Sequence, residues 1–166
     1  MTQTTATVLA SAATVEHISN SRNEPGWARK ARQEAWAIYE RTPMPSLNDE
    51  LWRRTDISTL KLDRLQPVLE RAPQAAAPDE LPAGLKHLLD VGDAEAAGYV
   101  AQYDGNTILT WLRPELREQG VIFTDLETAV REHASILRDY LMTQAVPPTY
   151  GKFEALHAAL WSGGVF

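Results

Sequence analysis

The four histidines of the chain are the residues best suited to acid-base or metal chemistry near neutral pH. His157 falls on the apolar side of a helix predicted near residue 160, where its ring could act as a base or a ligand. We interpret it instead as a core or interface histidine. His17, His87 and His133 are scattered among helical segments, and none has a second histidine four residues on, as in the H-E-x-x-H motif. The histidines therefore predict no metal site.

Carboxylates and glycines also lack a recognised arrangement. Asp90, Asp93 and Glu95 cluster beside Gly92 without the alternating oxygen ligands of a calcium loop, so we interpret them as a solvated turn. The paired glycines within 161–165 precede a predicted strand and so do not open a phosphate-binding helix. The sequence thus predicts no catalytic, cofactor-binding or metal-binding residue. An enzyme that uses Asp, Glu and His as acid and base is the weakest hypothesis.

Composition excludes several further classes of protein. The chain has no cysteine, which removes disulfides, thiolate nucleophiles and sulfur ligation of a metal. The net charge of −6 disfavours binding to nucleic acid, and we interpret the basic cluster Arg29, Lys30 and Arg32 as a solvated helix face. No apolar run approaches the roughly 18 residues of a membrane span. The first ten residues lack the pattern of a secretory signal, so a cytoplasmic location is expected.

Two helices are predicted within the first 41 residues. The first covers 5–19, where apolar residues recur at spacings of four and three, and we interpret it as a docked or swapped arm. Those residues are Val8, Ala12, Val15 and Ile18. The second helix follows Asn23, which can cap it, has Pro25 in its first turn and runs to about Arg41. Its apolar face is expected to carry Trp27, Ala31, Ala35 and Ile38.

The region from 42 to 97 is predicted to be less regular. Ser46 and Asp49 have the spacing of a capping box, so one short helical turn should carry Leu51 and Trp52. Residues 57–68 are expected to form an extended crossing segment. The Pro- and Ala-rich residues 71–82 are the expected mobile boundary, and a helix should follow around 85–89. Core packing is the expected role of the tryptophans in helix-like segments, Trp27, Trp36 and Trp52.

From Ala97 the apolar period changes to two, which indicates β-structure. Two strands within 98–112 flank Asp104-Gly105, a pair typical of the type I′ turn of a β-hairpin. Residues 121–123 are predicted to form a third short strand. Thr124 and Glu127 should then cap a helix. That helix would carry Leu126, Val130, Leu137 and Leu141. The pattern predicts a small antiparallel sheet covered by helices, which is an α+β fold.

The last fifteen residues read as an amphipathic helix, a glycine turn and the beginning of an apolar strand. Thr149 can cap this helix. Its expected apolar face contains Phe153, Leu156, His157 and Leu160. Val165 and Phe166 have two open interpretations: a short closing strand, or the first strand of a β-structure beyond residue 166. In the second case an open strand edge predicts a dimer or larger assembly of this chain.

Five short blocks stand out along the chain. They are Glu24–Trp27, Trp36–Glu40, Pro43–Pro45, Glu50–Asp56 and Lys152–Gly164. Together they resemble the amino-terminal region of the SufB/SufD scaffold proteins of iron-sulfur cluster assembly. The Trp52–Asp56 block is more similar to SufD and the 152–164 block at least as similar to SufB, so the branch stays open, with SufD slightly favoured. Residues from about Leu60 to Met142 are similar only in general plan.

The resemblance implies a longer parent protein. Members of that family continue into a right-handed parallel β-helix, which carries the cysteine and other ligands linked to cluster chemistry, and then into a helical tail. The implied partners are the ABC-type ATPase SufC and the companion SufB or SufD subunit, both docking downstream of Phe166. The parent complex would handle the iron-sulfur cluster and, through its ATPase subunit, ATP. No cofactor is expected in this chain.

The sequence thus favours a non-catalytic α+β module at the front of a SufB/SufD-like scaffold subunit. The expected division is a helical arm and helices over 1–58, an α+β region with the hairpin over 59–145, and a helix and first strand over 146–166. The alternative is a self-contained protein-interaction module that uses the Trp-bearing helices. The expected partners include neither nucleic acid nor a membrane, and a homo-oligomer of this chain is a possible assembly.

Overall fold

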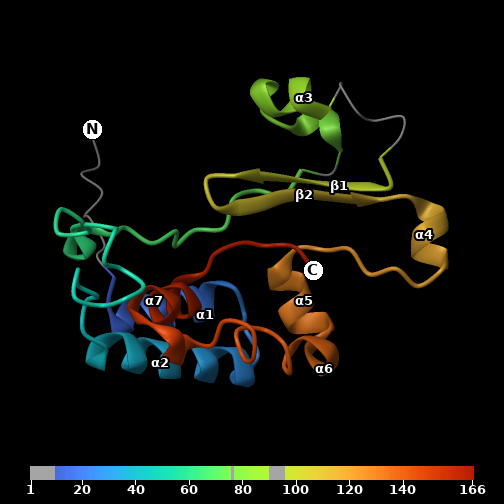
Figure 1. Ribbon diagram of the computed structural model, residues 1–166. Helices are drawn as coiled ribbons and strands as arrows, with labels where there is room; N and C mark the ends of the chain where they lie inside the picture. The colour runs from blue at the N-terminus through green and yellow to red at the C-terminus, as the bar shows by residue number, and fades with distance from the viewer. Residues whose placement is uncertain (1–9, 76, 90–95) are drawn as a thin grey trace, which may run out of the picture. The chain divides into compact units, whose positions relative to one another are not determined.

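The computed structural model describes residues 10–75, 77–89 and 96–166, which fall into two compact units (Figure 1). Unit 1 comprises residues up to 69 together with 138–161, and unit 2 comprises residues 70–137 together with 162–166. Helices and a two-stranded antiparallel sheet make up the described fold, as the α+β prediction requires. The predicted division of the chain into 1–58, 59–145 and 146–166 stays a prediction.

Unit 1 is a helical assembly. Its helices are α1 (Ala12–Ser21), α2 (Gly26–Arg41) and α7 (Lys152–Leu160), with 3-10 turns η1 (Leu62–Arg64) and η3 (Pro148–Tyr150). Ser11 caps α1 by accepting a hydrogen bond from the backbone N–H of Thr14 at 3.2 Å. The helix predicted over 5–19 ends two residues later than expected, and its residues 5–9 lie outside the described residues. Since α1 packs on α2 and α7, the described part of the arm is docked on its own chain.

Helix α2 ends at Arg41 as predicted, but its start and its buried face differ from the prediction. Pro25 is the N-cap residue, whereas Asn23 lies in the left-handed region with φ of 51°. The buried positions are Ala28, Arg32, Ala35 and Trp36. Of the expected face only Ala35 is buried, because burial of the charged Arg32 rotates the core side of the helix away from Ala31.

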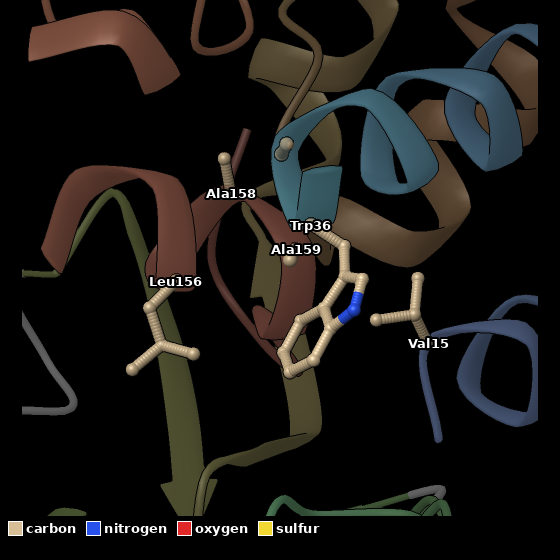
Figure 2. Close-up of a cluster of buried hydrophobic side chains, with 6 residues drawn as sticks. Val15, Trp36, Leu156, Ala158 and Ala159 are labelled. Atoms are coloured by element: carbon tan, nitrogen blue, oxygen red, sulfur yellow. The ribbon is translucent and has the colours of Figure 1, made fainter. Parts of the chain in front are cut away.

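Small side chains let α2 and α7 approach closely at the centre of unit 1. Ala35 and Ala159 are both fully buried, and Figure 2 shows Trp36 beside Val15, Leu156, Ala158 and Ala159. Core packing is therefore confirmed for Trp36. In contrast Trp27 and Trp52 are half-buried. The partner of Trp52 is Phe153, with ring centroids 5.2 Å apart.

The segment between α2 and unit 2 is irregular. The capping contact of Ser46 forms, because its backbone N–H donates to Asp49 Oδ2 at 2.7 Å. Residues 46–55 make successive turns in place of a helix, and Leu51 is exposed. The extended segment predicted over 57–68 contains a turn and η1, and its Leu62 and Leu65 pack against the core of unit 1.

The β-hairpin of unit 2 confirms the prediction. Its strands are β1 (Gly98–Tyr103) and β2 (Asn106–Leu112), paired antiparallel with an irregularity between Ala101 and Gln102. Asp104 and Gly105 have φ of 48° and 76°. Both positive values are what a type I′ turn requires, so this local pair sets the register next to the turn, and the irregularity after Ala101 shifts it by one residue further along.

The mobility expected of the segment 71–82 stays a prediction, and the two units divide at 69/70, directly before this segment. Ala75 N–H donates to Ile108 O at 2.8 Å, and the Gln74 side chain donates to Thr107 O at 2.7 Å, so this segment runs along β2. After η2 (Pro78–Glu80), Leu81 enters the core of unit 2. The predicted helix around 85–89 is confirmed as α3 (Ala83–Leu89).

The third strand predicted over 121–123 is wrong. Val121 and Ile122 remain exposed after the short helix α4 (Pro114–Glu118), which sequence reasoning missed. Pairing occurs one step later, where Thr124 and Phe166 exchange two backbone hydrogen bonds of 2.9 Å each and Asp125 forms a bridge with Val165. The apolar residues 121–123 did not predict the paired residues, because the segment that pairs is 40 residues away in the chain.

The helix predicted from Thr124 to Leu141 is two shorter helices. They are α5 (Leu126–Glu132) and α6 (Ala134–Leu137), separated at His133. The cap is Asp125, whose Oδ1 accepts from Thr128 N–H at 2.9 Å, and not Thr124. Leu141 lies beyond both helices.

Helix α7 also differs from its prediction in cap and face. Gly151 is the N-cap residue in place of Thr149, and the buried positions are Ala155, Leu156, Ala158 and Ala159. Leu156 is buried as expected, whereas His157 is exposed, so its interpretation as a core histidine is wrong. The close contact with α2 selects alanine positions over the larger residues of the predicted face.

Gly163 is expected to tolerate no side chain. A Cβ there would lie 2.5 Å from Gly105 O, a backbone atom of the hairpin turn that cannot move independently. Gly163→Ala should therefore cost about 1–3 kcal/mol by overpacking, seen as faster hydrogen exchange of the β1 and β2 amides. The control is Gly84→Ala in α3, where a Cβ meets nothing within 4 Å. That variant should stabilise by up to about 1 kcal/mol, and equal exchange in both variants would contradict the prediction.

Candidate functional site

A buried ion pair joins the beginning of α2 to its centre. Arg32 and Glu24 have side chains that are 1% and 3% exposed, and Arg32 Nη2 lies 2.7 Å from Glu24 Oε1. Arg32 Nε also donates to both carboxylate oxygens, at 3.0 and 2.9 Å. The Ser19 hydroxyl donates to Glu24 Oε2 at 2.7 Å. Each charge is therefore matched by several hydrogen bonds, as burial of an ion pair requires.

The same guanidinium connects α2 to α7. Arg32 Nη1 donates to Ala159 O at 3.0 Å, and its Cζ lies 4.0 Å from the centre of the Trp161 ring. Arg22 donates to Trp161 O at 3.5 Å and to Val68 O at 3.1 Å. These contacts satisfy carbonyls near the carboxyl end of α7, where cations are favoured.

The basic cluster predicted as one solvated face is divided among three environments. Arg32 is in the core, which makes that interpretation wrong for it. Arg29 donates to Asn20 Oδ1 at 2.7 Å, and the exposed Lys30 lies 3.6 Å from Glu34. A signal for Arg32 was present in the sequence, since Glu24 lies eight residues away and Trp161 provides an aromatic face, but the pairing depends on tertiary contacts.

Four of the blocks that carry the family resemblance are linked within unit 1 by the contacts of a few side chains. Glu24 pairs with Arg32 beneath Trp161, as described above. Lys152 Nζ donates to Tyr39 O at 2.6 Å and lies 3.9 Å from the centre of the Tyr39 ring. Trp52, from the Glu50–Asp56 block, contacts Phe153. The blocks are therefore the packing contacts of unit 1, and we assign them a structural role.

An open pocket of about 410 Å³ lies against α2 in unit 1. Its walls come from α2, from residues 138–148 and from the end of α7. The apolar lining includes Trp27, Ala31, Ile38, Leu141 and Met142. This size is within the range of small-molecule sites.

The other histidines and carboxylates that the structure describes form no cluster that could hold a metal ion. Among the described residues no group of three or more His, Asp or Glu could hold a metal ion. His17, His87 and His157 lie on α1, α3 and α7 and are exposed, and His133 stacks on Phe166 at 5.9 Å. The candidates Asp90, Gly92, Asp93 and Glu95 lie outside the described residues.

Unit 2 contains a second ionic contact. Arg71 Nε lies 3.2 Å from Glu127 Oε2, and Arg71 Nη2 lies 3.8 Å from Asp125 Oδ1. Both carboxylates are buried, and Asp125 also caps α5. One arginine thus holds the segment 71–75 against the start of α5, which is a structural function.

Tyr39 provides a test of burial in unit 1. Burial raises the pKa of its phenol above the ordinary value. Below a pH of about 10 the phenol is neutral in both the folded and the unfolded chain. Above that pH the phenol ionises first in the unfolded chain, so the free energy of unfolding decreases as the pH rises. The melting temperature of the wild type should fall more steeply above that pH than that of Tyr39→Phe. The control is Tyr150→Phe, at a 65% exposed position. The prediction would be wrong if Tyr150→Phe, and not Tyr39→Phe, reduced the fall of the melting temperature at high pH.

In the described residues of this α+β module, the blocks that carry the family resemblance make packing contacts. Curated proteins with similar sequences come from one family. The chain is 38% identical over 157 residues to an iron-sulfur cluster assembly SufBD family protein of Mycobacterium leprae, covering 90% of this chain and 17% of that protein. SufBD family proteins of Mycobacterium tuberculosis and Staphylococcus aureus are 37% and 33% identical, over 94% and 92% of this chain and 19% and 33% of their own lengths. The chain is therefore similar to SufBD family proteins over at least nine-tenths of its own length.

The chain spans between about a sixth and a third of the length of these relatives. No family model matches the chain, and no solved structure matches it. Within the part of the chain that the structure describes, no helix is long and apolar enough to cross a bilayer.

Proposed function

We propose that this chain is a non-catalytic, amino-terminal module of a SufB/SufD-like scaffold subunit that takes part in iron-sulfur cluster assembly in the cytoplasm. The observation that carries the proposal is the alignment of at least nine-tenths of the chain with curated SufBD family proteins. The contacts of Arg32, Trp52 and Lys152 support it, because they link the motif blocks into one folded unit. The module shapes and covers the scaffold.

Cluster chemistry in this proposal takes place outside these 166 residues. The sequence has no cysteine, so thiolate ligands for a cluster must come from other parts of the parent protein or from its partners. The partners are the ABC-type ATPase SufC and the companion SufB or SufD subunit. They bind regions other than this module.

Deletion of the module from the full-length protein tests the proposal. We expect the deletion variant to support less iron-sulfur enzyme maturation in cells than the wild type, with the abundance of the variant measured in the same samples. As a matched test in vitro, the isolated module should neither retain a cluster after anaerobic reconstitution with iron and sulfide nor capture SufC. Full maturation by the deletion variant, or robust capture of SufC by the module, would contradict the proposal.

The alternative function, a protein-interaction module, is favoured by a separate observation. Trp27 is only half-buried and lines the open pocket of unit 1, so one Trp-bearing helix presents apolar surface. Continued strand-glycine-strand repeats in the coding sequence after residue 166 would favour the scaffold module. A stop codon there would favour the interaction module.

A further inference from the structure

Among the described residues, the charged side chains that line the pocket of unit 1 include one cation, Arg138, for which no carboxylate partner is found. Four charged residues contribute to the lining: Lys30, Arg32, Glu34 and Arg138. Arg32 is neutralised by Glu24 at 2.7 Å, and Lys30 lies 3.6 Å from Glu34. Arg138 has no carboxylate partner among the described residues. In the part of the chain that the structure describes, the guanidinium of Arg138 is therefore available to a ligand in the pocket.

Arg138 is held near an aromatic wall. Its Cζ lies 5.8 Å from the centre of the Trp27 ring, at the outer limit of a cation–π contact. Trp27 forms the wall together with Ala31 and Ile38, which lie one and three turns further along α2. A bound apolar group would cover this face, and an acidic group on the same ligand could reach Arg138.

Another lining segment, residues 141–143, contains a backbone conformation that is rare for its residue type. Met142 has φ of 52°, in the left-handed region that bulky side chains seldom occupy, and its side chain lines the pocket beside Leu141. Such conformations persist where the surrounding structure holds them, and they are frequent at binding sites. Methionine also adapts its shape to varied apolar ligands.

We propose that this pocket binds a small organic acid, with an apolar or aromatic body between α2 and Met142 and its carboxylate on Arg138. The volume of about 410 Å³ fits a small molecule, and the guanidinium of Arg138 selects an anion over a neutral analogue of the same shape. The proposal concerns a site on the module itself and does not depend on its role in cluster assembly.

A matched pair of probes tests the proposal. 4-Phenylbutyrate and 4-phenylbutan-1-ol have the same apolar body and differ in the carboxylate. Titration of the 15N-labelled chain should show shifts at α2 and residues 141–143, with the acid binding roughly fivefold more tightly than the alcohol. In Arg138→Gln this preference should fall to about one, whereas Lys61→Gln, an exposed cation of unit 1 that does not line the pocket, should retain it.

Ala31→Phe tests the place of binding, because the exposed Ala31 lines the pocket and a larger side chain there would fill it. Both probes should lose binding in this variant. The Arg138 and Lys61 pair keeps the proposal testable if Ala31→Phe misfolds, since both cations are exposed. The proposal would be overturned if neither probe bound, if the two probes bound equally, or if Arg138→Gln kept the preference for the acid. Binding of acidic peptides without binding of the small acid would also overturn the proposal.

Discussion

Arg32→Ala is expected to lower the free energy of unfolding of unit 1 by about 3–5 kcal/mol, the cost of removing one partner from a buried ion pair. The substitution leaves the Glu24 carboxylate, 3% exposed, with only the Ser19 hydroxyl as a described side-chain donor. It also removes the donor to Ala159 O and the contact with Trp161. Denaturant unfolding, with hydrogen exchange to assign the transition to α2, measures the loss.

The pattern across variants distinguishes a buried pair from lost packing. The double variant Glu24→Leu, Arg32→Met should lose less stability than Arg32→Ala, because neither charge remains buried alone. The matched control is Lys30→Ala in the same helix, where both members of the ion pair are more than 60% exposed and a change within about 0.5 kcal/mol is expected. A loss below about 1 kcal/mol for Arg32→Ala would show that the pair is not buried as described.

Trp36→Ala should be the most damaging apolar substitution in the core of unit 1, with an expected loss of about 3–5 kcal/mol. Trp36 is 7% exposed and lies between α1 and α7, where Figure 2 shows Val15, Leu156 and Ala159 around its ring. The small alanines on α7 cannot expand to fill the space that its removal creates. Thermal and denaturant unfolding of the variant measure the effect.

Trp36→Phe should cost less than Trp36→Ala for two reasons. Phenylalanine keeps most of the buried ring, and it removes an indole N–H that has no hydrogen-bond acceptor among the described residues. Trp52→Ala is the comparison at a half-buried site, where the contact with Phe153 is lost. Equal losses for Trp36→Ala and Trp52→Ala would contradict the description of the core.

The family resemblance has a physical explanation in these contacts. Trp52 and Lys152 belong to different motif blocks and each contacts a residue far away in the chain, whereas Glu24 pairs with Arg32, eight residues away, whose guanidinium reaches Ala159. Their spacing predicted no catalytic chemistry, and the structure shows them in packing roles. The sequence was therefore informative about family because the packing of unit 1 depends on a few specific side chains.

Local chemistry was sufficient to predict several elements. Asp104-Gly105 determines the type I′ turn, because positive φ at both positions favours these residue types. Pro43 and Pro45 follow the end of α2, and the apolar spacing of Val15 and Ile18 located α1. Each of these signals acts within about five residues. These elements can therefore be predicted from neighbouring residues, without knowledge of tertiary contacts.

Only the tertiary structure decided which charges and apolar residues are buried. The sequence alone indicated the family resemblance, the hairpin and the helices α1, α2, α3 and α7, whereas Arg32 was predicted as solvated and is buried, and His157 was predicted as a core or interface residue and is exposed. The pairing of Thr124 with Phe166 was likewise hidden from sequence reasoning. The physical reason is that burial of a charge depends on the partner that neutralises it, and strand pairing depends on the neighbour that supplies hydrogen bonds. Both partners are selected by contacts between distant segments.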